Sequence, residues 1–290
     1  MRSLKKLFGG IDLTWKKVII ASIIAGVYTA IMAIVPALQY TSFNTIAVTF
    51  EVWILLGIII IMNSKSNKDA ALKCFVFFLI SQPLVYLIQV PFSWQHWGLF
   101  GYYKFWFIWT ILCLPMGYIG YYMKKNKWWG LLILLPMISL TLEQYAAYLS
   151  YFIFSYPRYI LISIFCAAAA IIYPIAIFDN KKIRIAGVSI SALLIIIITV
   201  FRLVNPFVYS TDLLLSGEEY TFDDTYKVYF DDEKYGDLSI KYEDGLECWK
   251  VHAEIKRDGK TTFTLESPEG EKREFSVDIK RDTYDLEEIK

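Results

Sequence analysis

Long apolar stretches separated by short polar loops dominate the first 207 residues of the chain. A helix needs roughly 17 to 25 residues to cross about 30 Å of hydrocarbon, and seven stretches meet that length. These predicted spans are Val18–Leu38, Ile46–Met62, Cys74–Phe92, Phe105–Met123, Trp128–Tyr148, Tyr159–Phe178 and Ile185–Phe207. The pattern therefore predicts a multi-span α-helical membrane bundle of seven helices.

Lysine and arginine are distributed unevenly between alternate loops. Fourteen of them precede the first span or lie in the second, fourth and sixth loops, whereas the opposite loops hold only Lys104 and Arg158. Short basic loops stay in the cytoplasm. This bias predicts a cytoplasmic basic N-terminus (1–17), a transmembrane domain (18–207) and an external C-terminal tail. Glu143 interrupts the fifth apolar stretch, and without that span the tail would lie inside.

The pattern changes after residue 207, where charged residues begin to alternate with β-branched and aromatic ones. Such alternation is typical of half-buried strands. The predicted strands are Tyr226–Phe230, Leu238–Glu243, Cys248–Lys256, Thr261–Glu266 and Arg273–Lys280. Asp244-Gly245, Asp258-Gly259 and the Pro268–Gly270 segment supply turn residues between them. One predicted apolar face contains Trp249, Val251, Ala253, Ile255, Phe263, Leu265, Phe275, Val277 and Ile279. A separate all-β domain is expected over 208–290.

The run from Gly259 to Lys280, with its Ser-Pro-Glu-Gly turn between two alternating segments, resembles the last hairpin of small bacterial immunoglobulin-like domains. The resemblance implies a small all-β immunoglobulin-like sandwich. It also implies display on a cell surface as a spacer, an adhesive module or a partner-binding module. Cys248 stands beside Trp249 without a second cysteine to pair with, which departs from antibody-type domains.

The whole chain has a formal net charge of +1, but the tail is strongly acidic. From Val208 onward it has 12 basic and 23 acidic side chains, a balance of −11. This balance disfavours binding to nucleic acid or to anionic lipid headgroups. Asp223-Asp224 and the Asp231–Glu233 cluster lack the spacing of a calcium-binding loop.

No motif predicts a metal, a cofactor or a reaction. The four cysteines are scattered, and neither a zinc pattern nor a motif of a metallopeptidase or serine hydrolase is present. The scattered cysteines and the lack of an Asn-x-Ser/Thr acceptor both suit a bacterial plasma membrane, and we interpret the host as a Gram-positive cell.

Polar and ionisable residues inside the spans are the candidate site, because a charge at the bilayer centre costs at least roughly 2.5 to 3.5 kcal/mol. With the predicted topology they gather in the outer half of the membrane and outline an outward-facing polar cavity. The candidates are Glu51, Gln82, Tyr86, Gln89, His96, Glu143, Arg202 and Asn205. Three interpretations remain open, in order of preference: Glu51 or Glu143 pairs with Arg202 to stabilise the bundle, the residues bind a ligand or ion, or they catalyse a reaction.

Two functions follow from these features. The first is a non-enzymatic surface component, in which the bundle presents the tail over the polar cavity to a small ligand or an extracellular partner. The second is a transporter, or the substrate-binding subunit of one. The expected partners are the lipid bilayer, that ligand or extracellular partner, and another membrane protein, with no nucleic acid.

Overall fold

The chain folds into two compact units, one helical and one formed largely by β-strands. The structure, a computed structural model, describes residues 2–39, 41–93, 95–154, 159–205, 209–217, 220–244, 247–280 and 283–289. Arg158, Phe207 and Gly245, named above, lie outside these ranges. The first unit contains residues 1–149 and 158–200, and the second contains 150–157 and 201–290.

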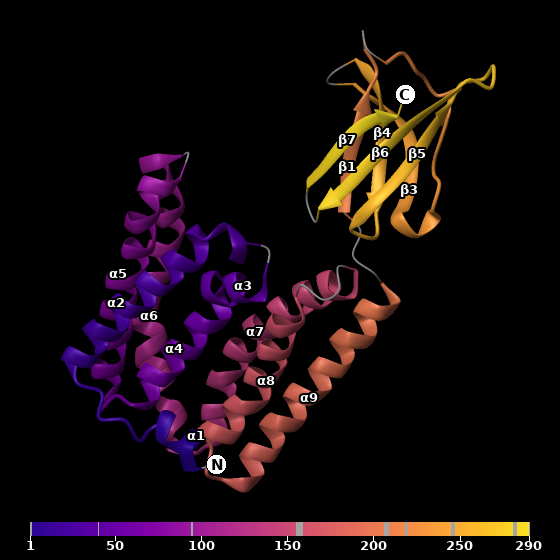
Figure 1. The fold of residues 1–290 in the computed structure, drawn as a ribbon. Coiled ribbons are helices and arrows are strands. Elements are labelled where there is room, and N and C mark those ends of the chain that lie inside the picture. Colours follow the sequence, from indigo (N-terminus) through magenta and orange to yellow (C-terminus); the bar gives the residue numbers. More distant parts are fainter. Residues whose placement is uncertain are drawn as a thin grey trace. The chain divides into compact units, whose positions relative to one another are not determined.

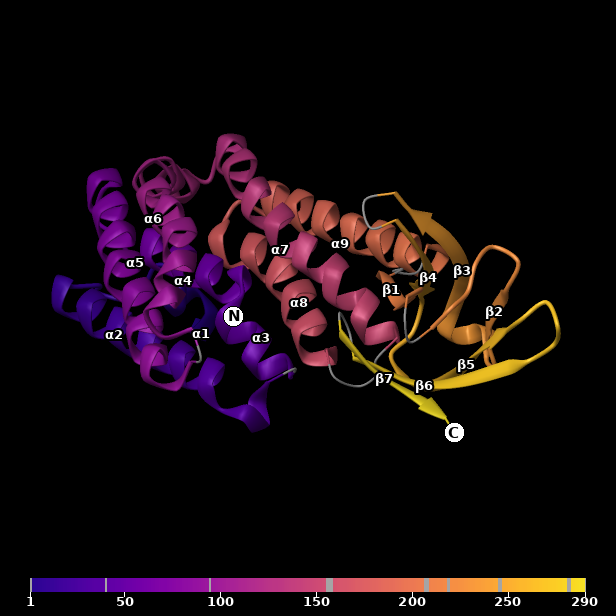
Figure 2. The same ribbon diagram turned by 90° about the horizontal axis from the view of Figure 1, so that it is seen from above.

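The helical unit contains a short N-terminal helix and a bundle of longer ones (Figure 1). The helices are α1 (Arg2–Leu7), α2 (Trp15–Ile34), α3 (Ser42–Val48), α4 (Phe50–Met62), α5 (Asn67–Gln89), α6 (Phe100–Gly120), α7 (Trp128–Phe154), α8 (Ile160–Ile177) and α9 (Lys181–Val204). Figures 1 and 2 show α5 packed beside both α2 and α6. Short 3₁₀ segments cover Pro36–Leu38 (η1), Val90–Phe92 (η2), His96–Leu99 (η3) and Tyr121–Lys125 (η4).

Six helices among the described residues are long and apolar enough to cross a membrane. They correspond to the first and the third to seventh predicted spans, so a membrane-embedded bundle is confirmed. Glu143 does not interrupt α7, which continues through it to Phe154. The second predicted span is divided into α3 and α4, which meet at a bend of 50°. The count reaches seven only if that pair forms one span, so seven spans stay a prediction.

The segments predicted to be basic loops meet at one end of the helical unit. The side chain of Asn63, which follows α4, donates to the Leu7 carbonyl and accepts from the Ile11 amide, both at 2.7 Å. Further bonds join Lys73 Nζ to the Leu13 carbonyl (2.7 Å), Lys124 Nζ to the Ser64 carbonyl (2.8 Å), the Asp179 amide to Asn126 Oδ1 (2.7 Å), and Lys5 to Asp179. These contacts place the N-terminal segment and the loops near residues 63, 126 and 179 on the same side.

The bent pair returns the chain to this end. Beside the last turns of α2, Asn44 donates to the Met32 carbonyl (2.6 Å) and Thr29 donates to the Ala47 carbonyl (3.2 Å). α4 then ends at Met62, next to the N-terminal segment. Since α2 begins at this end, α3 and α4 together cross the unit in the opposite direction to α2.

The β domain consists of two antiparallel sheets (Figures 1 and 2). One has the strand order β1 (Tyr209–Leu215), β4 (Cys248–Ile255), β3 (Gly236–Glu243). The other has the order β2 (Lys227–Phe230), β5 (Gly259–Glu266), β6 (Lys272–Lys280), β7 (Thr283–Ile289). A 3₁₀ turn, η5 (Glu233–Tyr235), precedes β3. Gly270 adopts a φ of +87° in the β5–β6 turn, a conformation that glycine adopts without a steric penalty.

A single apolar core lies between the sheets. Eight of the nine residues predicted for the apolar face are buried, and Trp249 is half-buried against them. Phe263 and Phe275 face each other in the β5–β6 register, with stacked rings whose centroids are 5.0 Å apart. The alternation in the sequence therefore predicted β4, β5 and β6 together with the side of each of them that faces inward.

Two strands, β1 and β7, were not predicted. β1 follows α9 closely, and its sequence, Tyr-Ser-Thr-Asp-Leu-Leu-Leu, does not alternate regularly between apolar and polar residues. In β7 only Tyr284 and Leu286 pack on the core, and acidic residues surround them. Immunoglobulin domains pair the first strand with the second and the third with the sixth. Here β4 pairs with both β1 and β3, so the strand order differs from that of immunoglobulin domains. The resemblance is limited to the two-sheet architecture, and the immunoglobulin-like class stays a prediction.

Two leucines provide a matched test of the core. Leu265 is 3% exposed and Leu215 is 47% exposed. We expect Leu265→Ala to reduce the free energy of unfolding of a 209–290 fragment by about 2 to 5 kcal/mol, because it leaves a cavity. Leu215→Ala should change it by less than about 1 kcal/mol. Urea unfolding followed by circular dichroism measures both, and equal losses would contradict the assigned core.

Candidate functional site

Three threonines shape the chain where α3 gives way to α4. Thr41, Thr45 and Thr49 are spaced four residues apart, and the latter two hydroxyls donate to carbonyls four residues earlier. The Thr45 hydroxyl donates to the Thr41 carbonyl at 3.1 Å, and Thr49 Oγ1 lies 2.5 Å from the Thr45 carbonyl oxygen. Bonds of this kind commonly bend helices. Thr49 has extended backbone angles, so it ends α3 and begins α4.

Glu51 lies in the first turn of α4 and is completely buried. Its Oε2 contacts the Thr49 hydroxyl, and its Oε1 lies 3.9 Å from the Cys166 Sγ on α8. Within the described part of the helical unit, no basic side chain lies within ion-pair distance of Glu51. Glu51 is thus a buried carboxyl whose partners are a hydroxyl, a thiol and its own backbone N–H.

A second buried polar group lies on α8, two turns beyond Cys166. The hydroxyl of Tyr173 is buried beside Thr141 on α7 and has no hydrogen-bond partner among the described residues. The Thr141 hydroxyl donates to the Met137 carbonyl at 2.9 Å, so its one hydrogen is used there. Thr49, Cys166 and Tyr173 are not among the site residues predicted from the sequence. The Thr-x-x-x-Thr-x-x-x-Thr spacing before Glu51 is the signal that reveals the first of them.

The predicted residues on α5 share one helical face but differ in environment. Gln82 is 3% exposed, and its Nε2 has no hydrogen-bond partner among the described residues. The Tyr86 ring packs against Phe100 and Tyr103, and Gln89 Nε2 donates to the Val85 carbonyl at 3.0 Å.

The other predicted residues lie at the surface of their units or near the end of α9. His96 and Glu143 are exposed, and His96 has a left-handed φ of 45°. Arg202 is in the last turn of α9, and Asn205 Nδ2 donates to the Phe201 carbonyl at 3.2 Å. Both belong to the second unit. A Glu51–Arg202 or Glu143–Arg202 pair would join the two units and stays a prediction, as does the polar cavity.

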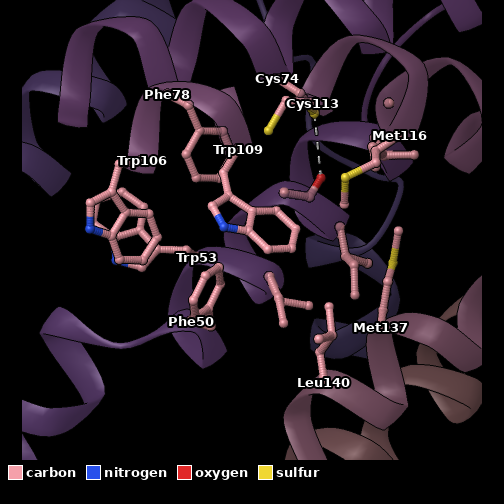
Figure 3. A pocket seen from close by; sticks show the side chains of 15 residues that line it. Phe50, Trp53, Cys74, Phe78, Trp106, Trp109, Cys113, Met116, Met137 and Leu140 are labelled. Carbon is pink, nitrogen blue, oxygen red and sulfur yellow. Dashed lines mark hydrogen bonds between the residues drawn. The ribbon is translucent and has the colours of Figure 1, made fainter. Parts of the chain in front are cut away.

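The helical unit also contains an apolar cavity of about 80 Å³, between α4, α5, α6 and α7 (Figure 3). None of the predicted site residues lines it. Figure 3 shows aromatic rings grouped on one side and the methionine side chains on the other. The lining residues are Phe50, Trp53, Ile54, Gly57, Ile58, Ile61, Cys74, Phe78, Trp106, Trp109, Cys113, Met116, Met137, Leu140 and Gly117. The three- and four-residue spacing along α4 and α6 is the sequence signal for this shared face.

In the β domain, charged side chains cluster on the sheet formed by β1, β4 and β3. His252 Nδ1 lies 2.8 Å from Asp212 Oδ1, and it carries the hydrogen because an ionised carboxylate only accepts. Lys250 Nζ lies 3.1 Å from Asp212 and 2.6 Å from Glu243. Burial opposes ionisation of Asp212, but the hydrogen bonds from His252 and Lys250 outweigh it and lower the pKa of that carboxyl below its ordinary 3.8.

Among the described residues, no group of three or more histidine, cysteine, aspartate or glutamate side chains is placed to hold a metal ion. Comparisons of the chain with protein-family models, with curated proteins and with solved structures find no match.

The Asp212 cluster predicts how the stability of the β domain depends on pH. A lowered pKa in the folded state means that the contribution of Asp212 is present above its ordinary pKa and is lost as pH falls through the folded-state pKa. We expect the melting-temperature difference between wild type and Asp212→Asn to be largest near neutral pH and to shrink below about pH 4.

Melting curves of the 209–290 fragment between neutral and acidic pH measure this difference. Asp244→Asn is the matched control, because it removes the same charge from an exposed turn residue. A gap between wild type and Asp212→Asn that stays constant at all pH values would contradict the stabilising role of the ionised Asp212.

Proposed function

We propose that this chain is a multi-pass bacterial plasma-membrane protein that presents its β domain outside the cell as a non-enzymatic binding component. One observation carries the proposal: the β domain has a closed apolar core of its own, in a unit separate from the apolar bundle. A domain that needs no packing from the bundle is suited to display at the end of a membrane anchor.

The distribution of basic residues supports the orientation. The contacts at residues 5, 63, 124 and 179 gather the lysine-rich segments at one end of the helical unit. Segments rich in lysine and arginine stay in the cytoplasm. α3 and α4 return the chain to that end, so we count them as one bent span. Seven crossings then place the tail outside.

The surface chemistry of the tail limits the kind of partner. An excess of 11 negative charges repels nucleic acid and anionic headgroups. It favours a basic protein surface or a small cationic ligand. The immunoglobulin-like resemblance extends only to the two-sheet architecture. Domains of that class bind partners at cell surfaces, which supports the same role here. Another membrane protein is also a suitable partner.

Protease treatment of intact cells tests this orientation. In a full-length chain tagged at both ends, we expect external protease to remove the C-terminal tag and to spare the N-terminal tag, which should be lost only after lysis. Surface cross-linking should then capture a partner with the full chain but not with a variant truncated after Val204. Protection of the C-terminal tag in intact cells would overturn the proposal.

The bent α3–α4 pair favours a second function, transport or substrate binding for a transporter. Interrupted helices with polar groups at the break commonly form transporter sites. If this function is correct, the full-length chain should copurify from native membranes with an ATP-hydrolysing subunit. This copurification should occur without any cross-link to the β domain. Copurification with surface proteins alone would contradict it.

A further inference from the structure

The contacts at the α3–α4 break need more hydrogens than the Thr49 hydroxyl can supply. Thr49 Oγ1 lies 2.5 Å from the Thr45 carbonyl oxygen and also directly contacts Glu51 Oε2. Oxygen atoms approach this closely when a hydrogen lies between them. A hydroxyl carries one hydrogen, and the Thr45 carbonyl carries none. An ionised Glu51 would leave one of the two contacts without a hydrogen.

A protonated Glu51 satisfies both contacts. Its carboxyl hydrogen is donated to Thr49 Oγ1, and the Thr49 hydrogen is donated to the Thr45 carbonyl. The second carboxyl oxygen remains an acceptor, and the Cys166 thiol, a weak donor, faces it at 3.9 Å. Every hydrogen in this chain of contacts then has one donor and one acceptor.

The surroundings supply no charge to balance a carboxylate. From α8, the Cys166 thiol faces Glu51, and α3 has no titratable side chain. Cys74 on α5 and Cys113 on α6 line the cavity on another side of α4. On the elements packed against α4, Lys124 donates to the Ser64 carbonyl beyond the end of α4, and Lys73 pairs with Asp69 at 2.7 Å. The other basic side chains on these elements, Lys68, Lys104 and Lys125, are exposed. An unpaired charge buried in an apolar bundle is costly, whereas a neutral carboxyl is not.

We propose that Glu51 is a proton-binding site of the bundle, in which the protonated carboxyl and the Thr49 hydroxyl form a hydrogen-bonded relay to the Thr45 carbonyl. Release of the proton would leave a carboxylate that takes the Thr49 hydrogen for itself. The Thr45 carbonyl, which lies at the bend, would then lose the hydrogen bond from the Thr49 hydroxyl. Proton binding is thus linked to the geometry of the α3–α4 break. The inference goes beyond the proposed function and does not depend on the side on which the tail lies.

Dicyclohexylcarbodiimide, which reacts with protonated carboxyls in apolar surroundings, tests the proposal on the full-length protein in membranes. The carboxyl O–H adds across one C=N bond, its proton moves to nitrogen, and acyl transfer gives a stable N-acylurea without a leaving group. Peptide mass spectrometry at pH 7 should show the adduct on Glu51. Asp179, an exposed carboxyl bound to Lys5, is the internal control and should remain unmodified.

Infrared spectroscopy provides a measurement that does not require the reagent to reach the site. Wild type should show a protonated-carboxyl band that Glu51→Gln lacks. Thr49→Val should shift this band to the position of a carboxyl without a hydrogen-bond acceptor, whereas Thr49→Ser should leave it unchanged. Absence of the band from wild type at neutral pH would overturn the proposal, whatever the labelling result.

Thermal stability in detergent distinguishes a proton site from an ion pair. Glutamine resembles a protonated carboxyl in shape and in having a donor, so Glu51→Gln should melt within about 2 °C of wild type. Glu51→Ala should melt more than about 5 °C lower, because it leaves a buried cavity and an unpaired hydroxyl. If Glu51→Gln loses as much stability as Glu51→Ala, and Arg202→Gln loses a similar amount, the carboxyl is an ionised partner of Arg202 and the proposal is wrong.

Discussion

Backbone groups inside hydrocarbon have no water to bond with, and this requirement governs how a membrane bundle can bend. At Thr49 the chain leaves one helix and enters another, which would normally free carbonyls at the end of α3. The Thr29 hydroxyl on α2 donates to one of them, the Ala47 carbonyl, at 3.2 Å, and the Thr45 carbonyl accepts from both the amide (3.0 Å) and the hydroxyl of Thr49. Threonine hydroxyls thus donate to backbone carbonyls at the bend, where hydrocarbon offers no water.

The same requirement explains why a carboxyl is tolerated beside the bend. Glu51 follows the break by two residues, where its oxygen reaches the Thr49 hydroxyl and its other oxygen reaches α8. A neutral carboxyl offers both a donor and an acceptor, and the site contains a complement for each. The polar groups at the α3–α4 break thus act as partners for one another, whereas the neighbouring cavity is surrounded almost entirely by aromatic, aliphatic and sulfur-containing side chains.

The two units rely on different sources of stability. The β domain buries its own phenylalanines and aliphatic side chains between two sheets, as water-soluble domains do. In the bundle, many large apolar side chains remain exposed on α2, α6 and α9, including Ile24, Ile108 and Ile196. Such exposure is unfavourable in water and favourable against lipid. This contrast assigns the first unit to the membrane.

Periodicity and charge let the sequence by itself determine the apolar helices, the separate β domain, the inward side of its strands and the grouping of the basic loops. Each of these follows from a local repeat, either a run of apolar residues or alternation at every second position.

β7 was not predicted because its two inward residues, Tyr284 and Leu286, are too few to make a repeat. The sequence identifies Glu51 as an ionisable residue inside a predicted span, but it does not identify the residues that contact it. Thr49 lies two residues before Glu51 in the sequence, whereas Cys166 reaches Glu51 only because α8 packs against α4, which no local pattern encodes. Tertiary packing likewise decided which faces of α4, α5, α6 and α7 enclose the cavity, since its volume is the space that four separate segments leave between them.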